Sequence, residues 1–181
     1  MIRLVAMAAL GALLAGCQSA QFTDPSSEYY DYKPGTKLVI HKNIRIPPGR
    51  TNIYFQFGQP RVANQFKPLC RFYVYGRSGS EARTVEPGEY LSRRWERVRR
   101  MVWHDGNPVM FASMRIMGGD GPSHVTWGTW FYLDGDADGE PRLLMCGQLG
   151  DWNAISSVNG YVSFDQIQET LGGYMSLTEP Q

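Results

Sequence analysis

Histidine and cysteine are scarce in this sequence, with three of each among 181 residues. The histidines stand far apart, and none has the His-x-x-x-His spacing with which one helix face binds zinc. The chain also lacks the Gly-x-Ser-x-Gly turn that presents the nucleophile of many hydrolases. These absences leave no recognisable catalytic constellation, so the sequence favours a protein that is not an enzyme.

An excess of charge of one sign is lacking as well. Lys and Arg number 18 and Asp and Glu 17, which gives a formal net charge of +1. A general nucleic-acid binder would need a basic excess, so no nucleic-acid partner is expected. No apolar run beyond the N-terminus approaches the ~20 residues that a membrane-spanning helix needs.

The N-terminus carries the first strong positive signal. Arg3 precedes an almost wholly apolar run, Leu4–Leu14, whose length suits the h-region of a signal peptide. The run ends in Leu-Ala-Gly-Cys at residues 14–17. This tetrapeptide resembles the lipobox of bacterial lipoproteins, where a type II signal peptidase cleaves and the cysteine is acylated. The alternatives are an N-terminal core helix and a simple membrane anchor.

The resemblance implies a signal peptide over residues 1–16, a lipidated N-terminus with a flexible tether over 17–36, and a periplasmic domain over 37–181. Fatty acyl chains such as palmitate on Cys17 would anchor the protein permanently, because each buried CH₂ contributes ~0.8 kcal/mol. Gln18 and Ser19 stand where the Asp that retains lipoproteins in the inner membrane would be expected. The implied location is therefore the outer membrane, facing the periplasm.

Cys70 and Cys146 are the cysteines that remain after Cys17 is assigned. In an oxidising compartment an even pair forms a disulfide by default. Closing a loop of about 75 residues would remove roughly 4 kcal/mol of unfolded-chain entropy. Two separate buried thiols are the alternative.

Alternation of apolar and polar residues predicts many short strands. Leu38–Ile46 and Ile53–Phe57 flank a Pro-Pro-Gly turn, which predicts a hairpin or meander. Glu89–Trp103 fits a helical stripe or a strand between two turns, and its neighbours favour the strand. Further strands are expected at Leu69–Tyr75, Val109–Met117, Val125–Leu133 and Arg142–Cys146.

One helix is expected near the C-terminus. Ser163 and Gln166 have the spacing of a capping box, and Gly172 follows as a terminator. Tyr174–Leu177 then reads as an edge strand. Together the elements predict a mainly β protein, a single antiparallel β-sandwich or barrel with one short C-terminal helix.

A second resemblance covers most of the expected domain. Its residues are Ile-Pro-Pro-Gly-Arg at 46–50, Phe55-Gln56, Pro-Leu-Cys at 68–70, Pro87-Gly88, Met145-Cys146 and Leu171-Gly172. This pattern resembles a group of proteobacterial lipoproteins to which no activity is attached. It supports the envelope location and implies no particular chemistry.

An acidic stretch offers a candidate metal site. Asp134, Asp136 and Asp138 with Gly139 match the opening of a calcium loop, D-x-D-x-D-G. The twelfth position is Met145, where the motif needs a bidentate Glu, and no helix is expected beside the loop. The sequence predicts at most weak Ca²⁺ binding and no other cofactor. A solvated acidic hairpin tip is the alternative.

Arginines and aromatic residues offer candidate binding surfaces. Guanidinium groups suit phosphates and carboxylates, so the arginine run could contact lipid, glycan or an acidic partner. An ordinary exposed face of a strand or helix is the alternative. The tryptophans could stack on sugars, or they could simply pack in the core. The residues are Arg93, Arg94, Arg97, Arg99 and Arg100, and Trp95, Trp103, Trp127, Trp130 and Trp152.

The sequence therefore predicts an outer-membrane-anchored periplasmic lipoprotein that binds or scaffolds another envelope component, a protein or a glycan. One alternative is an enzyme that modifies envelope glycans or lipids with carboxylates such as Asp134 or Glu140. Another is a ligand-binding β-barrel with an internal apolar cavity. A flat aromatic or basic patch would favour the binding module, and two close carboxylates in a pocket would favour the enzyme.

Overall fold

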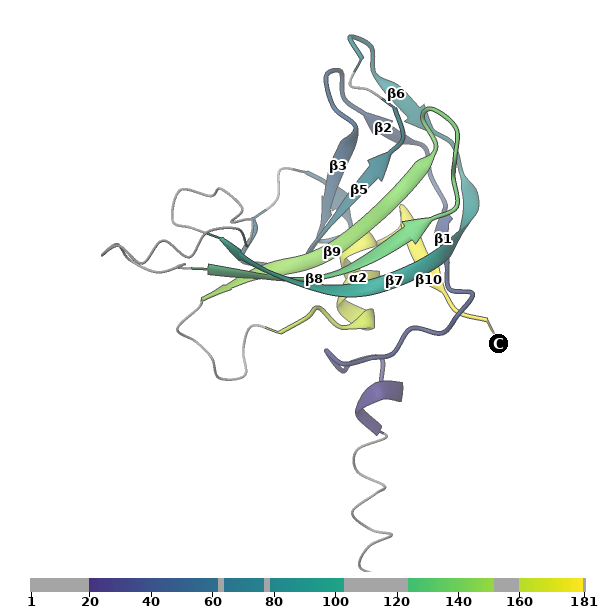
Figure 1. Cartoon of the computed structure of the whole chain (residues 1–181). Coiled ribbons are helices and arrows are strands. Elements are labelled where there is room, and N and C mark those ends of the chain that lie inside the picture. Colours follow the sequence, from purple (N-terminus) through teal and green to yellow (C-terminus); the bar gives the residue numbers. More distant parts are fainter. Residues whose placement is uncertain (1–19, 62–63, 77–78, 103–123, 152–159, 181) are drawn as a thin grey trace, which may run out of the picture.

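The computed structural model describes residues 20–61, 64–76, 79–102, 124–151 and 160–180. Within them, eight antiparallel strands form one strongly curled sheet, a half-barrel, and a short helix lies inside its curve (Figure 1). The expected fold class, mainly β with one short helix near the C-terminus, is confirmed. No described helix is long and apolar enough to cross a membrane.

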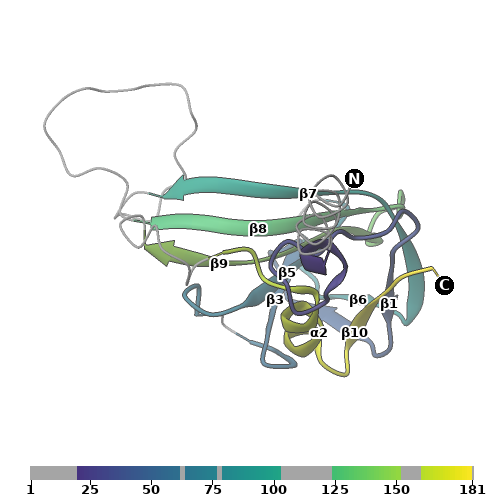
Figure 2. The same ribbon diagram turned by 90° about the horizontal axis from the view of Figure 1, so that it is seen from below.

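The sheet order is β10-β1-β7-β8-β9-β5-β3-β4, and a small second sheet pairs β2 with β6. The bounds are β1 Lys37–Ile40, β2 Ile44–Ile46, β3 Asn52–Gln56, β4 Gln59–Pro60, β5 Leu69–Val74, β6 Arg83–Val85, β7 Gly88–Val102, β8 His124–Leu133, β9 Pro141–Asp151, α2 Phe164–Leu171 and β10 Met175–Thr178. Strands β7, β8 and β9 are long and project past α2, as Figure 2 shows.

The concave side of the sheet holds the hydrophobic core. Side chains alternate between the two faces of each strand, so every second residue points inward. Phe131 of β8 lies opposite Leu144 of β9 and Trp95 of β7 in the strand register. Phe131 and Leu144 are fully buried. The remaining core residues of the strands follow the same rule, so the core is one layer that lines the curve.

Helix α2 fills the curve of the sheet. It begins as expected, with a capping box in which the Ser163 hydroxyl accepts a hydrogen bond from the Gln166 backbone N–H. Gln166 Oε1 accepts one in return from the Ser163 N–H at 2.9 Å. Ile167 and Leu171 of its inner face are fully buried against the sheet. The C-terminal strand expected after it is β10, which lies at the edge of the sheet.

The N-terminal segment departs from the expected tether. Tyr30 and Tyr32, which the sequence assigned to a flexible stretch ending at residue 36, are buried in the core. The ring of Tyr32 lies 4.8 Å from that of Phe131, and Trp95 Nε1 donates to the Tyr32 carbonyl at 2.9 Å. The packed part of the chain therefore begins well before residue 37, because two large aromatic side chains find room beside α2.

The hairpin expected around Pro47-Pro48-Gly49 is not formed. Strand β2 pairs with β6, and β3 pairs with β5. The expected strand from Leu38 to Ile46 is broken at residues 41–43, and the His41 N–H donates a hydrogen bond to the Tyr174 carbonyl. The Pro-Pro-Gly turn thus leads the chain from one sheet to the other. Residues 88–102 form the favoured strand, and Val109–Met117 lies outside the described residues.

Candidate functional site

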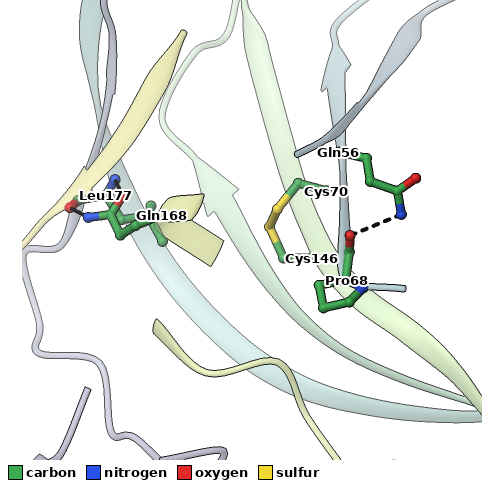
Figure 3. The surroundings of a disulfide bond; sticks show 6 residues. All are labelled: Gln56, Pro68, Cys70, Cys146, Gln168 and Leu177. Carbon is green, nitrogen blue, oxygen red and sulfur yellow. Dashed lines mark hydrogen bonds between the residues drawn. A yellow bond between two sulfur atoms is a disulfide. The ribbon is translucent and has the colours of Figure 1, made fainter. Parts of the chain in front are cut away.

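A disulfide fixes the sheet at its centre. Cys70 of β5 and Cys146 of β9 lie opposite each other in the register, with their Sγ atoms 2.06 Å apart, as expected (Figure 3). Both residues are buried. Nearby, the buried Gln56 side chain donates from Nε2 to the Pro68 carbonyl at 3.1 Å and to the Asn64 carbonyl at 2.9 Å. These bonds hold residues 64–68 against the end of β3.

The opposite, convex face of the same strands carries a shallow groove of about 390 Å³, here called the convex groove. Its walls come from β3, β5, β7, β8 and β9, and its side chains are half-exposed. Aromatic and aliphatic groups dominate where the outward face of a sheet would ordinarily be polar. The principal wall residues are Tyr54, Leu69, Arg71, Tyr73, Val98, Trp130, Met145 and Leu149.

Two glycines form the floor of the convex groove. Gly128 of β8 lies opposite Gly147 of β9, and both are buried. A Cβ on Gly147 would stand 2.3 Å from the Trp127 carbonyl oxygen and 2.8 Å from the Gly128 Cα, which the backbone cannot tolerate. The floor therefore needs glycine at 147, and the missing side chains create the depression beside Trp130.

Arg71 is held in a defined position at one wall of the groove. Its guanidinium carbon lies 5.0 Å from the centre of the Tyr54 ring and 4.7 Å from that of Tyr73, both within cation–π range. Its Nε donates to Asn52 Oδ1 at 3.1 Å. Within the described residues, the ion pairs are Lys37–Glu89 and Arg83–Asp138, so no described carboxylate neutralises Arg71.

A basic shoulder, formed by Arg50, Arg61 and Arg71, continues the convex groove. A second hollow of about 390 Å³ contains Arg50 and Arg61 and shares Tyr54 and Gln65 with the groove. Arg50 and Arg71 also line a third hollow. Among the residues that the structure describes, no Asp or Glu lines any of these three surfaces. The shoulder therefore presents positive charge directly beside the aromatic wall.

The predicted arginine run does not form one patch. Strand alternation places Arg94 on the convex face, 4.2 Å from the Tyr132 ring, while Arg97 and Arg99 lie on the other face. Arg97 Nη2 donates to the Tyr30 carbonyl at 2.6 Å, and Arg99 stacks 4.8 Å from the Trp127 ring. Arg93 Nη2 donates to the Asp134 carbonyl at 3.0 Å. The side chain of Arg100 is outside the described part of the chain.

Tyr132 and Glu96 add a polar contact beside Arg94. The Tyr132 hydroxyl donates a short hydrogen bond to Glu96 Oε1. Partial burial, and then this bond, raise the pKa of Tyr132 above its usual value. The tyrosine therefore stays neutral and donating at physiological pH.

In the acidic loop, the carboxylates of Asp134, Asp138 and Glu140 form contacts with other groups of the fold. Asp134 Oδ1 accepts the Leu91 N–H, and Asp138 pairs with Arg83 at 3.0 Å. Glu140 Oε2 accepts the N–H groups of Asp136 and Ala137, and these bonds lower the pKa of Glu140. In the described ranges no three His, Cys, Asp or Glu residues lie where they could hold a metal ion. Weak Ca²⁺ binding at the loop stays a prediction.

The described tryptophans have three different surroundings. Trp95 packs against the core, Trp127 meets the Tyr161 ring edge-on at 5.3 Å, and Trp130 lines the convex groove. Trp103 and Trp152 lie outside the described residues, as does Cys17. Of the three described tryptophans, only Trp130 contributes to the groove.

The convex groove was not predicted as a site from the sequence. Its signal was present at the outward positions of β3, β5, β8 and β9, where Tyr, Arg, Trp, Leu and Met stand instead of Lys or Glu. That signal becomes a surface only when the strand order is known, because residues from 54 to 149 meet in it. No protein-family model, curated protein or solved structure was found to match the chain.

Proposed function

We propose that this protein is an outer-membrane-anchored, periplasm-facing lipoprotein whose convex groove binds another protein of the cell envelope. The lipobox-like segment at residues 14–17 supports the anchor. The buried Cys70–Cys146 bond supports an oxidising compartment such as the periplasm, since cytosolic thiols are kept reduced.

The composition of the convex groove is the observation that carries the proposal. Interfaces between proteins are enriched in Tyr, Trp, Arg and Met and depleted in Lys and Glu. The groove has Tyr54, Tyr73, Trp130, Arg71 and Met145, and no described Lys or Glu lines it. A protein partner therefore fits this surface better than a small substrate does.

The rigidity of the groove supports the same conclusion. Binding costs about 0.5–1.5 kcal/mol for each flexible side chain that it immobilises. Arg71 is already held by Asn52 and by two tyrosine rings before a partner arrives. Gly128 and Gly147 let a partner side chain approach the backbone of β8 and β9 closely. The wall and floor are thus preorganised.

The basic shoulder defines the polar part of the partner. A guanidinium group pairs bidentately with a carboxylate, and such pairs steer association as well as fixing register. Arg50, Arg61 and Arg71 lie beside the aromatic wall without a described carboxylate partner. The partner segment is therefore acidic on one side and apolar on the other.

Site-specific photo-crosslinking in growing cells tests this function. A photoreactive residue replaces Tyr73 in the convex groove of the full-length protein, and we expect one discrete protein adduct. The matched control places the same residue at Thr84, an exposed position of β6 away from the groove. Trp130→Ala should abolish the Tyr73 adduct. An adduct that survives Trp130→Ala, or that forms equally from position 84, would reject the groove as the binding site.

The anchor is tested separately by mass spectrometry of the natively expressed protein. We expect a chain that starts at Cys17 and carries diacylglycerol and an amide-linked acyl chain. Cys17→Ser should leave the uncleaved precursor. An intact initiator methionine with no acyl adduct would contradict the proposed location.

A further inference from the structure

The segment from residue 20 to 32 determines how close the domain can lie to its anchor. Three peptide steps separate Cys17 from Ala20, the first described residue. A fully extended chain of that length reaches at most about 11 Å. We propose that residues 20–32 form a lipid-contact surface, which holds the domain directly against zwitterionic phospholipid with Phe22 and Tyr29 among the headgroups. This inference rests on the acylation of Cys17.

The segment is bound firmly to the domain, so only a short stretch of chain separates the anchor from the domain. Within the segment, the Asp31 N–H donates to the Phe22 carbonyl at 2.9 Å. The Asp165 N–H, in the first turn of α2, donates to the Pro25 carbonyl at 3.2 Å. The Tyr30 hydroxyl donates to Glu179 Oε2 at 2.6 Å. An acylated Cys17 would therefore bring this surface, and not a free tether, to the bilayer.

The exposed side chains of the segment suit a membrane interface. Phe22 is 49% exposed and Tyr29 46% exposed; the other exposed large hydrophobic residues of the described fold, Phe57, Phe66 and Leu91, lie outside the segment. Tyr and Trp are enriched at the headgroup level of membranes, where one end meets lipid and the other meets water. Phe is among the apolar residues that interfacial helices bury at the boundary between headgroups and acyl chains. Two exposed aromatic side chains so near an acylated cysteine would therefore insert into the surface of the bilayer.

The charges of the segment select the kind of lipid. Asp24 accepts hydrogen bonds from the N–H and the hydroxyl of Ser26, which lower its pKa and keep it ionised. Glu28 and Asp31 add further carboxylates. An anionic surface would repel them, so the contact depends on Phe22 and Tyr29 and favours zwitterionic headgroups. Lipid binding through a basic patch would show the opposite preference.

The orientation that follows can be seen in Figure 1. The short purple helix at the start of the described chain lies at the opposite end of the molecule from β2 and β6. With the segment on the membrane, β2 and β6 point away from the bilayer. Position 84 of β6 is therefore a suitable distant control.

Fluorescence quenching by brominated lipid tests the proposal. The natively acylated full-length protein carrying Phe22→Trp or Tyr29→Trp is reconstituted into vesicles of phosphatidylcholine with brominated acyl chains. The emission added by the new tryptophan is obtained by subtracting the parent protein. We expect most of the added emission at positions 22 and 29 to be lost, while that of the Thr84→Trp control is retained.

The outcomes separate this inference from the anchor itself. If the mass confirms acylation but positions 22 and 29 are quenched no more than position 84, the lipid-contact surface is refuted and the anchor stands. If no acyl chain is found, the anchor fails, and with it the inference. Stronger quenching at position 22 in vesicles with anionic lipid would refute the choice of zwitterionic headgroups.

Discussion

The concave and convex faces of the sheet are built from the same strands and have opposite chemistry. On β8, Phe131 and Leu133 point into the core and are buried, whereas Trp130 and Tyr132 are half-exposed on the outside. On β5, Cys70 and Phe72 are buried, and Arg71 between them lies in the convex groove. Neighbouring residues therefore serve different purposes: the inward set determines stability, and the outward set is available for binding.

The largest expected effect comes from one pair of neighbouring substitutions. Phe131→Ala leaves a cavity beneath Tyr32 and Leu144, and we expect the free energy of unfolding to fall by about 3–5 kcal/mol. Trp130→Ala, one residue away on the convex face, serves as the matched control and should cost at most about 1 kcal/mol. Urea unfolding followed by circular dichroism measures both. Equal losses would show that the two faces do not differ in this way.

Removal of the disulfide should have a comparable effect. The Cys70→Ala/Cys146→Ala double variant frees a loop with a sequence separation of 76, so we expect to lose about 4 kcal/mol of stability. The measurement compares denaturation midpoints of the variant with those of the parent, oxidised and reduced. A parent whose midpoint does not respond to reduction would contradict the prediction.

A smaller loss of stability is expected when the polar side chain of Gln168, on the concave side of the sheet, is removed. Gln168 Nε2 donates to the Leu177 carbonyl at 2.7 Å, and its Oε1 accepts the Leu177 N–H at 3.0 Å (Figure 3). Gln168→Ala leaves both backbone groups without this partner, at a cost of about 1–3 kcal/mol. Glu169→Ala, at the next and exposed position of α2, is the control and should change the midpoint little. A similar loss in both variants would argue against the role of the amide.

Alkaline pH gives a further test of the buried tyrosines. Burial, and then the hydrogen bond to Glu179, raise the pKa of Tyr30 to about 12, and burial also raises that of Tyr32. The stability that neutral Tyr30 contributes is complete below the unfolded value of 10.0 and is lost as the pH rises towards 12. Denaturation midpoints should fall over this range, and less steeply for Tyr30→Phe. A variant as steep as the parent would contradict the assignment.

Substitution of Arg71 should have the smallest effect on stability and a large effect on binding. Arg71 is half-exposed, and Arg71→Ala should change the free energy of unfolding by at most about 1 kcal/mol. The same variant should lose the Tyr73 photo-adduct. Arg71→Lys keeps the charge without the planar fork and should recover it only in part. Full crosslinking by Arg71→Ala would show that Arg71 does not contribute to binding.

The local elements could be predicted from the sequence because their signals are local. Alternation over Val125–Leu133 identified β8, and the Ser163 and Gln166 pair identified the start of α2. The apolar positions of the segment Glu89–Trp103 fit both a helix and a strand, and the neighbouring strands favour the strand, which β7 confirms.

The arrangement of these elements could not be predicted. The pairing of β2 with β6 depends on contacts about forty residues apart, and no local turn encodes it. The burial of Tyr30 and Tyr32 depends on the space beside α2. The convex groove likewise exists only once β3, β5, β8 and β9 lie side by side. A run of arginines in the sequence suggested one surface, and the two-residue period of β7 divided it between two faces.

The carboxamide of Gln168 also determines how the sheet ends. Strand β10 is the outermost strand on its side, and an unpaired outer strand invites another chain to add to it. This side chain forms hydrogen bonds with the outward N–H and carbonyl of Leu177, which are the two backbone groups that a further strand would pair with. At Leu177, therefore, the edge offers no free backbone group to which a strand of another copy could add.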